Sequence, residues 1–222
     1  GNALKKSWKI PHISTFHTLA KTKLRARPGE SESELRFDAE QNIMQSCDRI
    51  LVLTESESGD IRQLYDVAKS KISVIPAGVD IEMFTPIPQD VARRELGLES
   101  GNILLYVGRI EPIKGLDLLL ESVEILADHM DLNLIIVGGN LQSDKETQKL
   151  RKQVEDLDLS SKVTLVGSVP QDKLPYYYSA ADLFVLPSHY ESFGFVALES
   201  MSCGRPVVAS RVGGIPSFVD HG

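Results

Sequence analysis

The chain is poor in the residues that hold small secreted or metal-bound domains together. Its 222 residues include only two cysteines, Cys47 and Cys203, which lie far apart in the sequence. Neither a disulfide framework nor a cysteine-ligated zinc site is therefore indicated, and we expect two buried thiols. No apolar run approaches the roughly 20 residues of a membrane span, and the start of the chain lacks the order of a signal peptide. These absences predict a cytoplasmic protein.

Acidic residues outnumber basic ones except at the start of the chain. The formal net charge is −7, yet residues 1–29 hold seven Lys or Arg and no Asp or Glu. An acidic chain of this kind argues against nucleic acid as a partner. The basic segment is expected to be either a solvated surface or a local site for an anionic partner.

Short β-branched runs alternate with longer amphipathic segments, which is typical of βα units around a parallel sheet. With 42% hydrophobic and 25% charged residues, the chain has the composition of a globular protein. Strands are expected at 10–15, 50–53, 72–75, 102–107, 132–137, 163–166, 182–186 and 206–209. Helices are expected at 31–47, 55–67, 89–96, 114–128, 144–156, 171–179 and 195–203.

The periodic pattern stops at residues 76–88, where three prolines fall within thirteen residues. We expect a partial first domain over 1–77, a linker over 78–88 and a second domain over 89–222. The first domain offers too few elements for a complete doubly wound fold, whereas the second is nearly complete. The chain begins without Met and closes without an evident terminal helix, so we expect both ends to be cut from a longer protein.

The first candidate site is the segment from Tyr106 to Gly115, which leaves an apolar strand and enters a helix. Ligands of open α/β sheets bind beyond the carboxyl ends of strands, and helix N-termini favour phosphate. Gly108 allows close backbone approach, and Arg109 and Lys114 supply two cations suited to a diphosphate. The segment is not a Walker loop, because Gly-Lys-Ser/Thr is missing. The alternative is an ordinary charged surface loop.

The second candidate site holds two carboxylates, Glu191 and Glu199, directly after another expected strand. Gly194 is expected to open a helix and to leave backbone amides available beside the strand end. Glu191 can accept hydrogen bonds from sugar hydroxyls, and Glu199 can hold a vicinal diol such as ribose. Because its helical neighbours are small or apolar, Glu199 needs a partner or a ligand. A glycoside hydrolase would also use two carboxylates, but the Rossmann-like pattern makes it the poorer account.

These motifs resemble those of the family 4 retaining glycosyltransferases. Glu191 and Glu199 have the spacing of the E-x7-E signature, residues 108–115 are similar to the family's diphosphate loop, and residues 213–216 are similar to its tail loop. The resemblance covers residues 10–220. It implies an α/β protein of GT-B fold with two Rossmann-like parallel-sheet domains, of which the N-terminal one is only partly present.

The resemblance implies a hexosyltransferase that moves a sugar from a nucleotide diphosphate sugar to an acceptor hydroxyl, with retention and without a metal or other cofactor. Arg109 and Lys114 would stabilise the leaving diphosphate, and Glu199 would bind the ribose. The implied donor-binding residues are Gly108, Arg109, Lys114, Ser168, Val169, Glu191, Phe193, Gly194 and Glu199.

The segment after the first expected strand is similar to the one that bears the family's active-site histidine. A lone histidine is usually structural or merely exposed. Here His17 stands at a strand end, where ligands of such sheets bind. We expect it to donate a hydrogen bond to the donor sugar rather than to act as a nucleophile. With Arg109, Lys114 and Glu191 it completes the residues assigned to catalysis.

The basic residues after this histidine suggest a phosphorylated acceptor. The chain resembles the branch of inositol-phosphate N-acetylglucosaminyltransferases and sucrose-phosphate synthases, which favours a uridine diphosphate donor. In that branch a Thr, a Lys and a more distant Arg hold the acceptor phosphate; here they would be Thr18, Lys21 and Arg36. Two other interpretations stay open, namely a solvated basic run over residues 21–27 and contact of that run with anionic lipid.

The chain departs from the family pattern at both ends. It lacks the glycine-rich loop that reaches the phosphates and the helix that returns across both domains, so we expect this fragment alone to be weakly active or inactive. Two other functions remain open: a noncatalytic nucleotide-sugar-binding fragment, and a GT-B-fold nucleotide-sugar epimerase, which the E-x7-E spacing disfavours. The sequence does not set the sugar, the acceptor or the oligomeric state.

Overall fold

The computed structural model describes residues 1–26, 29, 31–98 and 101–220, which divide into two compact units. Unit 1 comprises Gly1–Ala77, Tyr190–Phe193 and Val212–Gly222, and unit 2 comprises Gly78–His189 and Gly194–Arg211. The chain first passes from unit 1 to unit 2 after Ala77, inside the proline-rich segment 76–88. The short segments 190–193 and 212–222 group with unit 1, although the sequence places them in the second domain. Arg27, part of the predicted basic run, lies outside the described residues.

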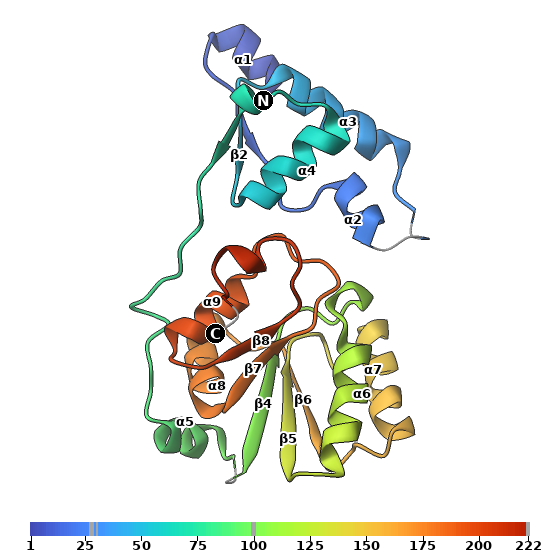
Figure 1. Ribbon diagram of the computed structural model, residues 1–222, viewed down its shortest axis with the longest axis vertical. Helices are drawn as coiled ribbons and strands as arrows, with labels where there is room; N and C mark the ends of the chain where they lie inside the picture. The colour runs from blue at the N-terminus through green and yellow to red at the C-terminus, as the bar shows by residue number, and fades with distance from the viewer. Residues whose placement is uncertain (27–28, 30, 99–100, 221–222) are drawn as a thin grey trace. The chain divides into compact units, whose positions relative to one another are not determined.

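Unit 1 is built on a three-stranded parallel sheet in the order β1-β2-β3. The strands are β1 (Ile13–Thr15), β2 (Arg49–Val52) and β3 (Ile72–Val74), which lie within or next to the predicted ranges. Its helices are α1 (Asn2–Trp8), α2 (Ala20–Ala26), α3 (Glu34–Ser46) and α4 (Glu55–Tyr65), shown in the upper part of Figure 1. Its buried core consists of Leu19, Met44, Cys47, Ile50, Val52, Ile61 and Tyr65.

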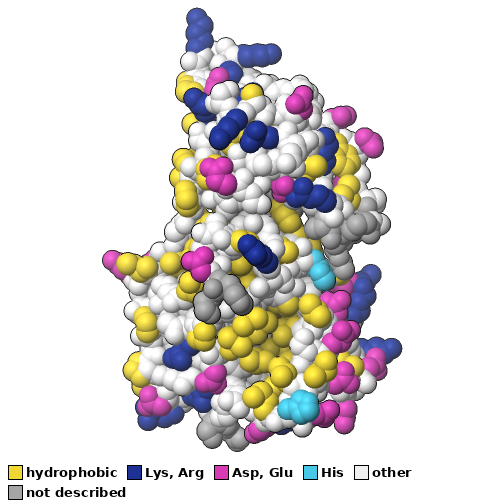
Figure 2. All heavy atoms as spheres, viewed as in Figure 1, with side chains coloured by type: hydrophobic (Ala, Val, Ile, Leu, Met, Phe, Trp, Pro, Cys, Tyr) yellow, Lys and Arg dark blue, Asp and Glu magenta, His cyan; other side chains and the backbone are white. Residues whose placement is uncertain are grey.

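Two helices of unit 1, α1 and α2, are absent from the sequence prediction. Helix α1 has no buried residue, so it carries no periodic apolar face. It is held instead by Lys5, whose ammonium lies 3.0 Å from the carbonyl of Ser46 and 2.7 Å from the carboxylate of Asp48. Both helices lie in the basic start of the chain. In the view of Figure 2, Lys and Arg side chains gather over the end of unit 1 that carries α1.

Unit 2 is a doubly wound sheet in the order β6-β5-β4-β7-β8, with every neighbouring pair parallel. The strands are β4 (Asn102–Val107), β5 (Leu132–Val137), β6 (Val163–Gly167), β7 (Leu183–Leu186) and β8 (Val207–Ala209). Helices α6 (Leu116–Ala127) and α7 (Lys145–Asp156) lie on one side of the sheet, and α8 (Leu174–Ala180) and α9 (Phe195–Ser202) on the other (Figure 1). The strand order therefore reverses between β4 and β7, which is a topological switch point.

Residues 78–88, predicted as a linker, group with unit 2. Phe84 is 2% exposed, and its ring meets that of Tyr178 edge-on with 6.0 Å between centroids. The hydroxyl of Ser202 also donates to the Phe84 carbonyl. The prolines interrupt the periodic pattern here, but one buried aromatic residue anchors the segment ahead of α5 (Gln89–Leu96).

Both cysteines are free and buried, as their isolation in the sequence predicts. Burial raises the pKa of the Cys203 thiol to about 11. Among the helices of the described ranges, none is long and apolar enough to cross a membrane.

Candidate functional site

The loops that follow β4, β5 and β6 are joined by backbone hydrogen bonds at the carboxyl edge of the unit 2 sheet. The amide of Gly108 donates to the Val137 carbonyl over 3.0 Å, and the amide of Ser168 donates to the Gly139 carbonyl over 3.0 Å. A side chain at Gly138, whose φ is 138°, would overlap the carbonyl of Gly108. This edge is where open α/β sheets bind ligands. The Gly138-Gly139 pair directly after β5 is the sequence signal for this close approach.

The loop after β4 also touches the end of β7, across the switch point. A side chain at Gly115, whose φ is 67°, would overlap the carbonyl of Pro187. The amide of His189 donates to the Ile113 carbonyl over 2.9 Å. The segment that carries the predicted diphosphate cations is therefore held directly against the strand that leads to the carboxylate motif.

The two predicted cations both lie in this loop. Lys114 ends a short 3₁₀ turn, Pro112–Lys114, and is half-buried. The side chain of Arg109 is 72% exposed and forms an ion pair with Glu111. Glu111, which is not among the predicted site residues, offsets part of the positive charge of the loop. Such an exposed pair is weak, so an incoming diphosphate can compete for the Arg109 guanidinium.

Ser168 and Val169 follow β6 at the same edge. The Ser168 hydroxyl donates to the Gly139 carbonyl over 2.8 Å, so this side chain holds the neighbouring loop. Val169 is half-buried. The use of their backbone groups by a nucleobase stays a prediction.

Helix α9 begins after Gly194, as predicted, with that glycine in the left-handed region at φ 96°. Glu199 lies one turn into the helix, and its carboxylate accepts a 2.7 Å hydrogen bond from the hydroxyl of Tyr178 on α8. Burial raises the pKa of Glu199, and the Tyr178 hydrogen bond opposes this. The partner that the apolar surroundings require is thus Tyr178, which the sequence analysis missed. The remaining carboxylate lone pairs can still accept hydrogen bonds from a diol.

Glu191 and His17 lie in unit 1, far apart in sequence but close in structure. The hydroxyl of Ser192 donates to the His17 carbonyl over 2.6 Å. A side chain at Gly213, whose φ is 53°, would overlap the Glu191 carbonyl. Phe193 is 4% exposed and packs its ring against that of Phe218. The tail loop therefore packs against the segment that carries the first carboxylate of the motif.

The predicted residues fall into two sets, one in each unit. Unit 2 holds Gly108, Arg109, Lys114, Ser168, Val169, Gly194 and Glu199. Unit 1 holds His17, Thr18, Lys21, Arg36, Glu191 and Phe193.

In unit 1, the three predicted acceptor residues are connected through one buried carboxylate, Glu40. Arg36 donates from Nη2 to the Thr18 carbonyl over 2.8 Å and from Nε to Glu40 over 3.0 Å. Its Nη1 pairs with Glu32 over 2.9 Å. Two carboxylates thus offset the charge of Arg36, so an acceptor phosphate would have to compete with them.

Lys21 is also engaged by the fold. Its ammonium donates to the Leu64 carbonyl over 2.6 Å and lies 4.5 Å from the centroid of the Tyr65 ring. The Tyr65 hydroxyl accepts from the Lys21 amide over 3.2 Å and donates to Glu40. The Thr18 hydroxyl donates to the carbonyl of the preceding residue over 2.8 Å. This network is absent from the sequence prediction, although the i,i+4 spacing of Arg36 and Glu40 is a signal for part of it.

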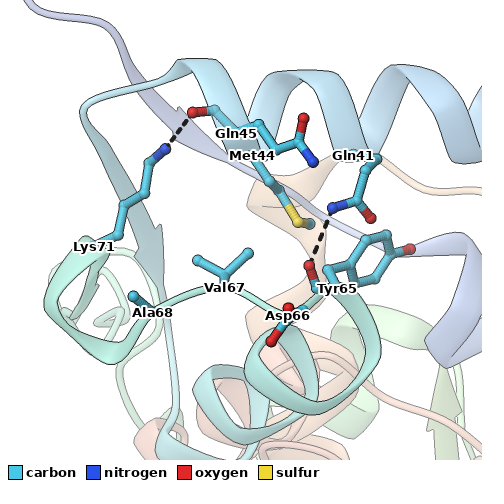
Figure 3. A pocket seen from close by; sticks show the side chains of 8 residues that line it. All are labelled: Gln41, Met44, Gln45, Tyr65, Asp66, Val67, Ala68 and Lys71. Atoms are coloured by element: carbon cyan, nitrogen blue, oxygen red, sulfur yellow. Dashed lines mark hydrogen bonds between the residues drawn. The ribbon is translucent and has the colours of Figure 1, made fainter.

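Unit 1 also has a surface cavity of about 250 Å³ between α3 and the segment after α4 (Figure 3). At its rim, Gln41 donates to the Tyr65 carbonyl over 3.1 Å and Lys71 donates to the Gln45 carbonyl over 2.7 Å. These hydrogen bonds join the two elements that line the cavity. None of the predicted site residues is among its lining residues.

The sequence contains one Asp-x-Asp triplet, Asp156 to Asp158. It stands at the end of α7, after the helix has returned from the carboxyl edge of the sheet toward the start of β6 at Val163. The triplet therefore lies at the edge opposite the candidate site. Over the described residues, no three His, Cys, Asp or Glu are grouped so that they could hold a metal ion.

Two family models match the chain. Glycosyl transferases group 1 matches residues 88–222, and Glycosyltransferase Family 4 matches residues 1–83. The D-inositol 3-phosphate glycosyltransferase of Acidothermus cellulolyticus is 38% identical over an alignment that covers 100% of this chain and 52% of the relative. That of Mycolicibacterium smegmatis is 38% identical over 97% of this chain and 50% of its own length. The chain thus spans about half the length of these relatives.

Solved structures agree with this assignment. Sucrose-phosphate synthase from Thermosynechococcus elongatus is similar with a TM-score of 0.84 and 33% identity, over 94% of this chain and 52% of that one. Anabaena Alr3699/HepE, solved in complex with UDP-glucose, gives a TM-score of 0.84 at 23% identity, over 100% of this chain and 59% of that one, which shows the fold alone. The parallel sheets and these neighbours confirm the predicted α/β architecture of GT-B type. This chain therefore belongs to the glycosyl transferases group 1 family.

Proposed function

We propose that the protein is a retaining glycosyltransferase that moves a sugar from a nucleotide diphosphate sugar to an acceptor hydroxyl. The observation that carries this proposal is the switch point of unit 2. There the cation-bearing loop after β4 is held against the end of β7, which leads to Gly194 and Glu199. An edge of parallel strands, two cations and a helix N-terminus together suit a diphosphate.

Within unit 2 the proposed roles follow from chemistry. Arg109 and Lys114 would offset the charge that develops on the leaving diphosphate. Glu199, oriented by Tyr178, would accept hydrogen bonds from the two ribose hydroxyls. The backbone at Ser168 and Val169 would meet the nucleobase.

In unit 1, Glu191 and Phe193 would contact the donor sugar, and His17 would donate a hydrogen bond to it. In a retaining transfer the acceptor attacks from the face that the diphosphate leaves. The departing phosphate can then take the acceptor proton, so no protein base is required. The protein mainly supplies positioning and electrostatic stabilisation.

We further propose a uridine diphosphate donor and a phosphorylated small-molecule acceptor. The donor is supported by the UDP-glucose complex of the HepE protein, which has the same fold. The acceptor is supported by the relatives named D-inositol 3-phosphate glycosyltransferases and by the closeness of Thr18, Lys21 and Arg36. An acceptor phosphate at Arg36 would compete with the two carboxylates, Glu32 and Glu40, that already pair with the guanidinium.

A panel of UDP, GDP and ADP tests the donor site through the melting temperature of the protein. A nucleotide at 100 times its dissociation constant stabilises the native state by about 2.7 kcal/mol, and we expect the largest shift with UDP. Transfer from radiolabelled UDP-sugars by the full-length protein tests the reaction itself. Binding without transfer would favour the noncatalytic alternative, and an epimerised sugar would favour the epimerase. No shift with any nucleotide diphosphate would contradict the donor site.

A further inference from the structure

The hydroxyl of Ser192 joins the segment that bears Glu191 to the residue that bears the imidazole. Ser192 donates from Oγ to the backbone carbonyl of His17 over 2.6 Å, across 175 positions of sequence. The hydroxyl of Tyr190, a largely buried residue, lies 3.3 Å from the same Ser192 oxygen. The segment 190–193 thus belongs to unit 1 although it stands between β7 and α9 of unit 2 in the sequence.

Backbone contacts hold the segment from its other side. The amide of Gly214 donates to the Glu191 carbonyl over 3.3 Å. A side chain at Gly214 would come within 2.6 Å of the Ser192 carbonyl and 2.9 Å of the Thr54 methyl group. Thr54 is the N-cap of α4, and its own hydroxyl accepts from the Glu57 amide. The Ser192 side chain therefore adds a hydrogen-bonding tether to these backbone and steric contacts.

We propose that Ser192 is a positioning residue for the donor sugar. Its hydrogen bond fixes the backbone of Glu191 relative to the backbone of His17, and each backbone sets where its own side chain points. Small misplacements of such groups lower binding and turnover strongly. This inference rests on the proposed function, since it takes Glu191 and His17 as the two groups that meet the sugar.

We expect a substitution of Ser192 to lower the affinity for UDP-glucose and to leave the affinity for UDP unchanged. UDP lacks the sugar, so its affinity does not depend on Glu191 or His17, whereas the affinity for UDP-glucose does. We expect Ser192→Ala to leave the dissociation constant of UDP within twofold and to weaken UDP-glucose about fivefold, the size of one net hydrogen bond. Calorimetry on the full-length protein measures both. Ser192→Thr keeps a hydroxyl and should retain most of the affinity for UDP-glucose.

Ser46→Ala is the matched control. Ser46 also lies in unit 1 and its hydroxyl also donates to a backbone carbonyl, that of Asn42, but this bond is confined to α3. We expect no change in either dissociation constant. The proposal would be overturned if Ser192→Ala lost affinity for UDP and UDP-glucose equally. It would also be overturned if Ser192→Ala and Ser46→Ala lost the same affinity for UDP-glucose.

Hydrogen exchange separates this inference from the proposed function. Ser192→Ala should speed amide exchange at residues 190–193 and at Gly214, while Ser46→Ala should not. Unchanged exchange would show that the hydroxyl does not hold the segment. Faster exchange with an unchanged preference for UDP-glucose over UDP would overturn the positioning role and leave the proposed function standing. If the wild-type protein binds UDP-glucose no better than UDP, the sugar site assigned to Glu191 and His17 fails as well.

Discussion

The two units present their candidate site residues in opposite ways. In unit 2 the site is framed by backbone, because glycines let the loops after β4, β5 and β7 touch one another. In unit 1 the site is framed by charged side chains that already bind each other, as Arg36 does with Glu32 and Glu40. A backbone frame keeps its shape when a ligand leaves, whereas a charged network must exchange partners when one arrives. We therefore expect changes at the unit 2 loops to act on turnover, and changes in the charged network around Arg36 in unit 1 to act on acceptor affinity.

The largest expected effect is on turnover, from Lys114→Ala and Glu199→Gln in the full-length protein. Loss of one charged hydrogen bond at such a site raises the barrier by about 2–4 kcal/mol, or about 30-fold to nearly 1000-fold in rate. Steady-state transfer from a labelled donor measures it. The control is Lys162→Ala, since Lys162 pairs with Asp131 beyond the amino edge of the same sheet. Wild-type turnover in either site variant would remove that residue from the donor site.

A smaller effect is expected from Lys21→Ala in unit 1. A hydrogen bond to a charged group contributes about 1.5–3 kcal/mol, so the Michaelis constant for a phosphorylated acceptor should rise at least about tenfold. The constant for the dephosphorylated analogue should rise much less. Because Lys21 also holds the Leu64 carbonyl, the ratio of the two constants is the diagnostic quantity. Equal changes for both acceptors would rule out phosphate recognition by Lys21.

The lipid alternative for the basic segment is tested separately by flotation with anionic vesicles. Arg25 is paired with Asp60, and Lys23 with Glu32, which reduces the charge available to a membrane. We expect binding to phosphatidylserine vesicles to be weak and unchanged by Arg25→Ala. Strong binding that requires Lys23 and Arg25 would favour the membrane interpretation instead.

A further effect, on stability, is expected from Glu199→Gln. Burial raises the pKa of Glu199, so its ionised form destabilises the native state at neutral pH. The amide oxygen of Gln can still accept from Tyr178, and we expect a gain on the order of 0.5 kcal/mol at pH 7 after solvent screening of the half-exposed carboxylate. The gain should shrink as the pH falls through the raised pKa toward the ordinary value of 4.5. Denaturant unfolding at pH 7 and pH 4.5 measures it, and a gain that grows on acidification would contradict this account.

No change is expected from a chelator. Arg109, Lys114 and the start of α9 are proposed to offset the diphosphate charge without a metal ion. Transfer in the presence of excess EDTA should equal transfer without it. Loss of activity that magnesium or manganese restores would place the protein in another class of transferases.

The sequence predicted unit 2 more fully than unit 1, for physical reasons. Buried strands such as β4 and β5 are long apolar runs, and α5 spans the predicted residues Gln89–Leu96. Helix α1 has no buried face, so periodicity did not reveal it. The grouping of Glu191 with His17 depends on a contact between residues 175 positions apart in sequence, which local sequence patterns do not reveal.

The same limit applies to the site itself. The residues that resemble the family motif were found from spacing alone, but their partners were not. Tyr178 holds Glu199 through a contact between two helices, whereas Glu40 holds Arg36 from one turn along α3. Neither partner lies within the motif that it supports.

The central claim is that the carboxyl edge of the unit 2 sheet binds the diphosphate of a nucleotide sugar. Calorimetric titration of UDP into the wild-type protein, Lys114→Ala and Lys162→Ala tests it most directly. The account predicts at least about a tenfold loss of affinity in Lys114→Ala, the effect of one charged hydrogen bond, and less than a twofold change in Lys162→Ala. Equal affinity in all three proteins, or an equal loss in both variants, would contradict it.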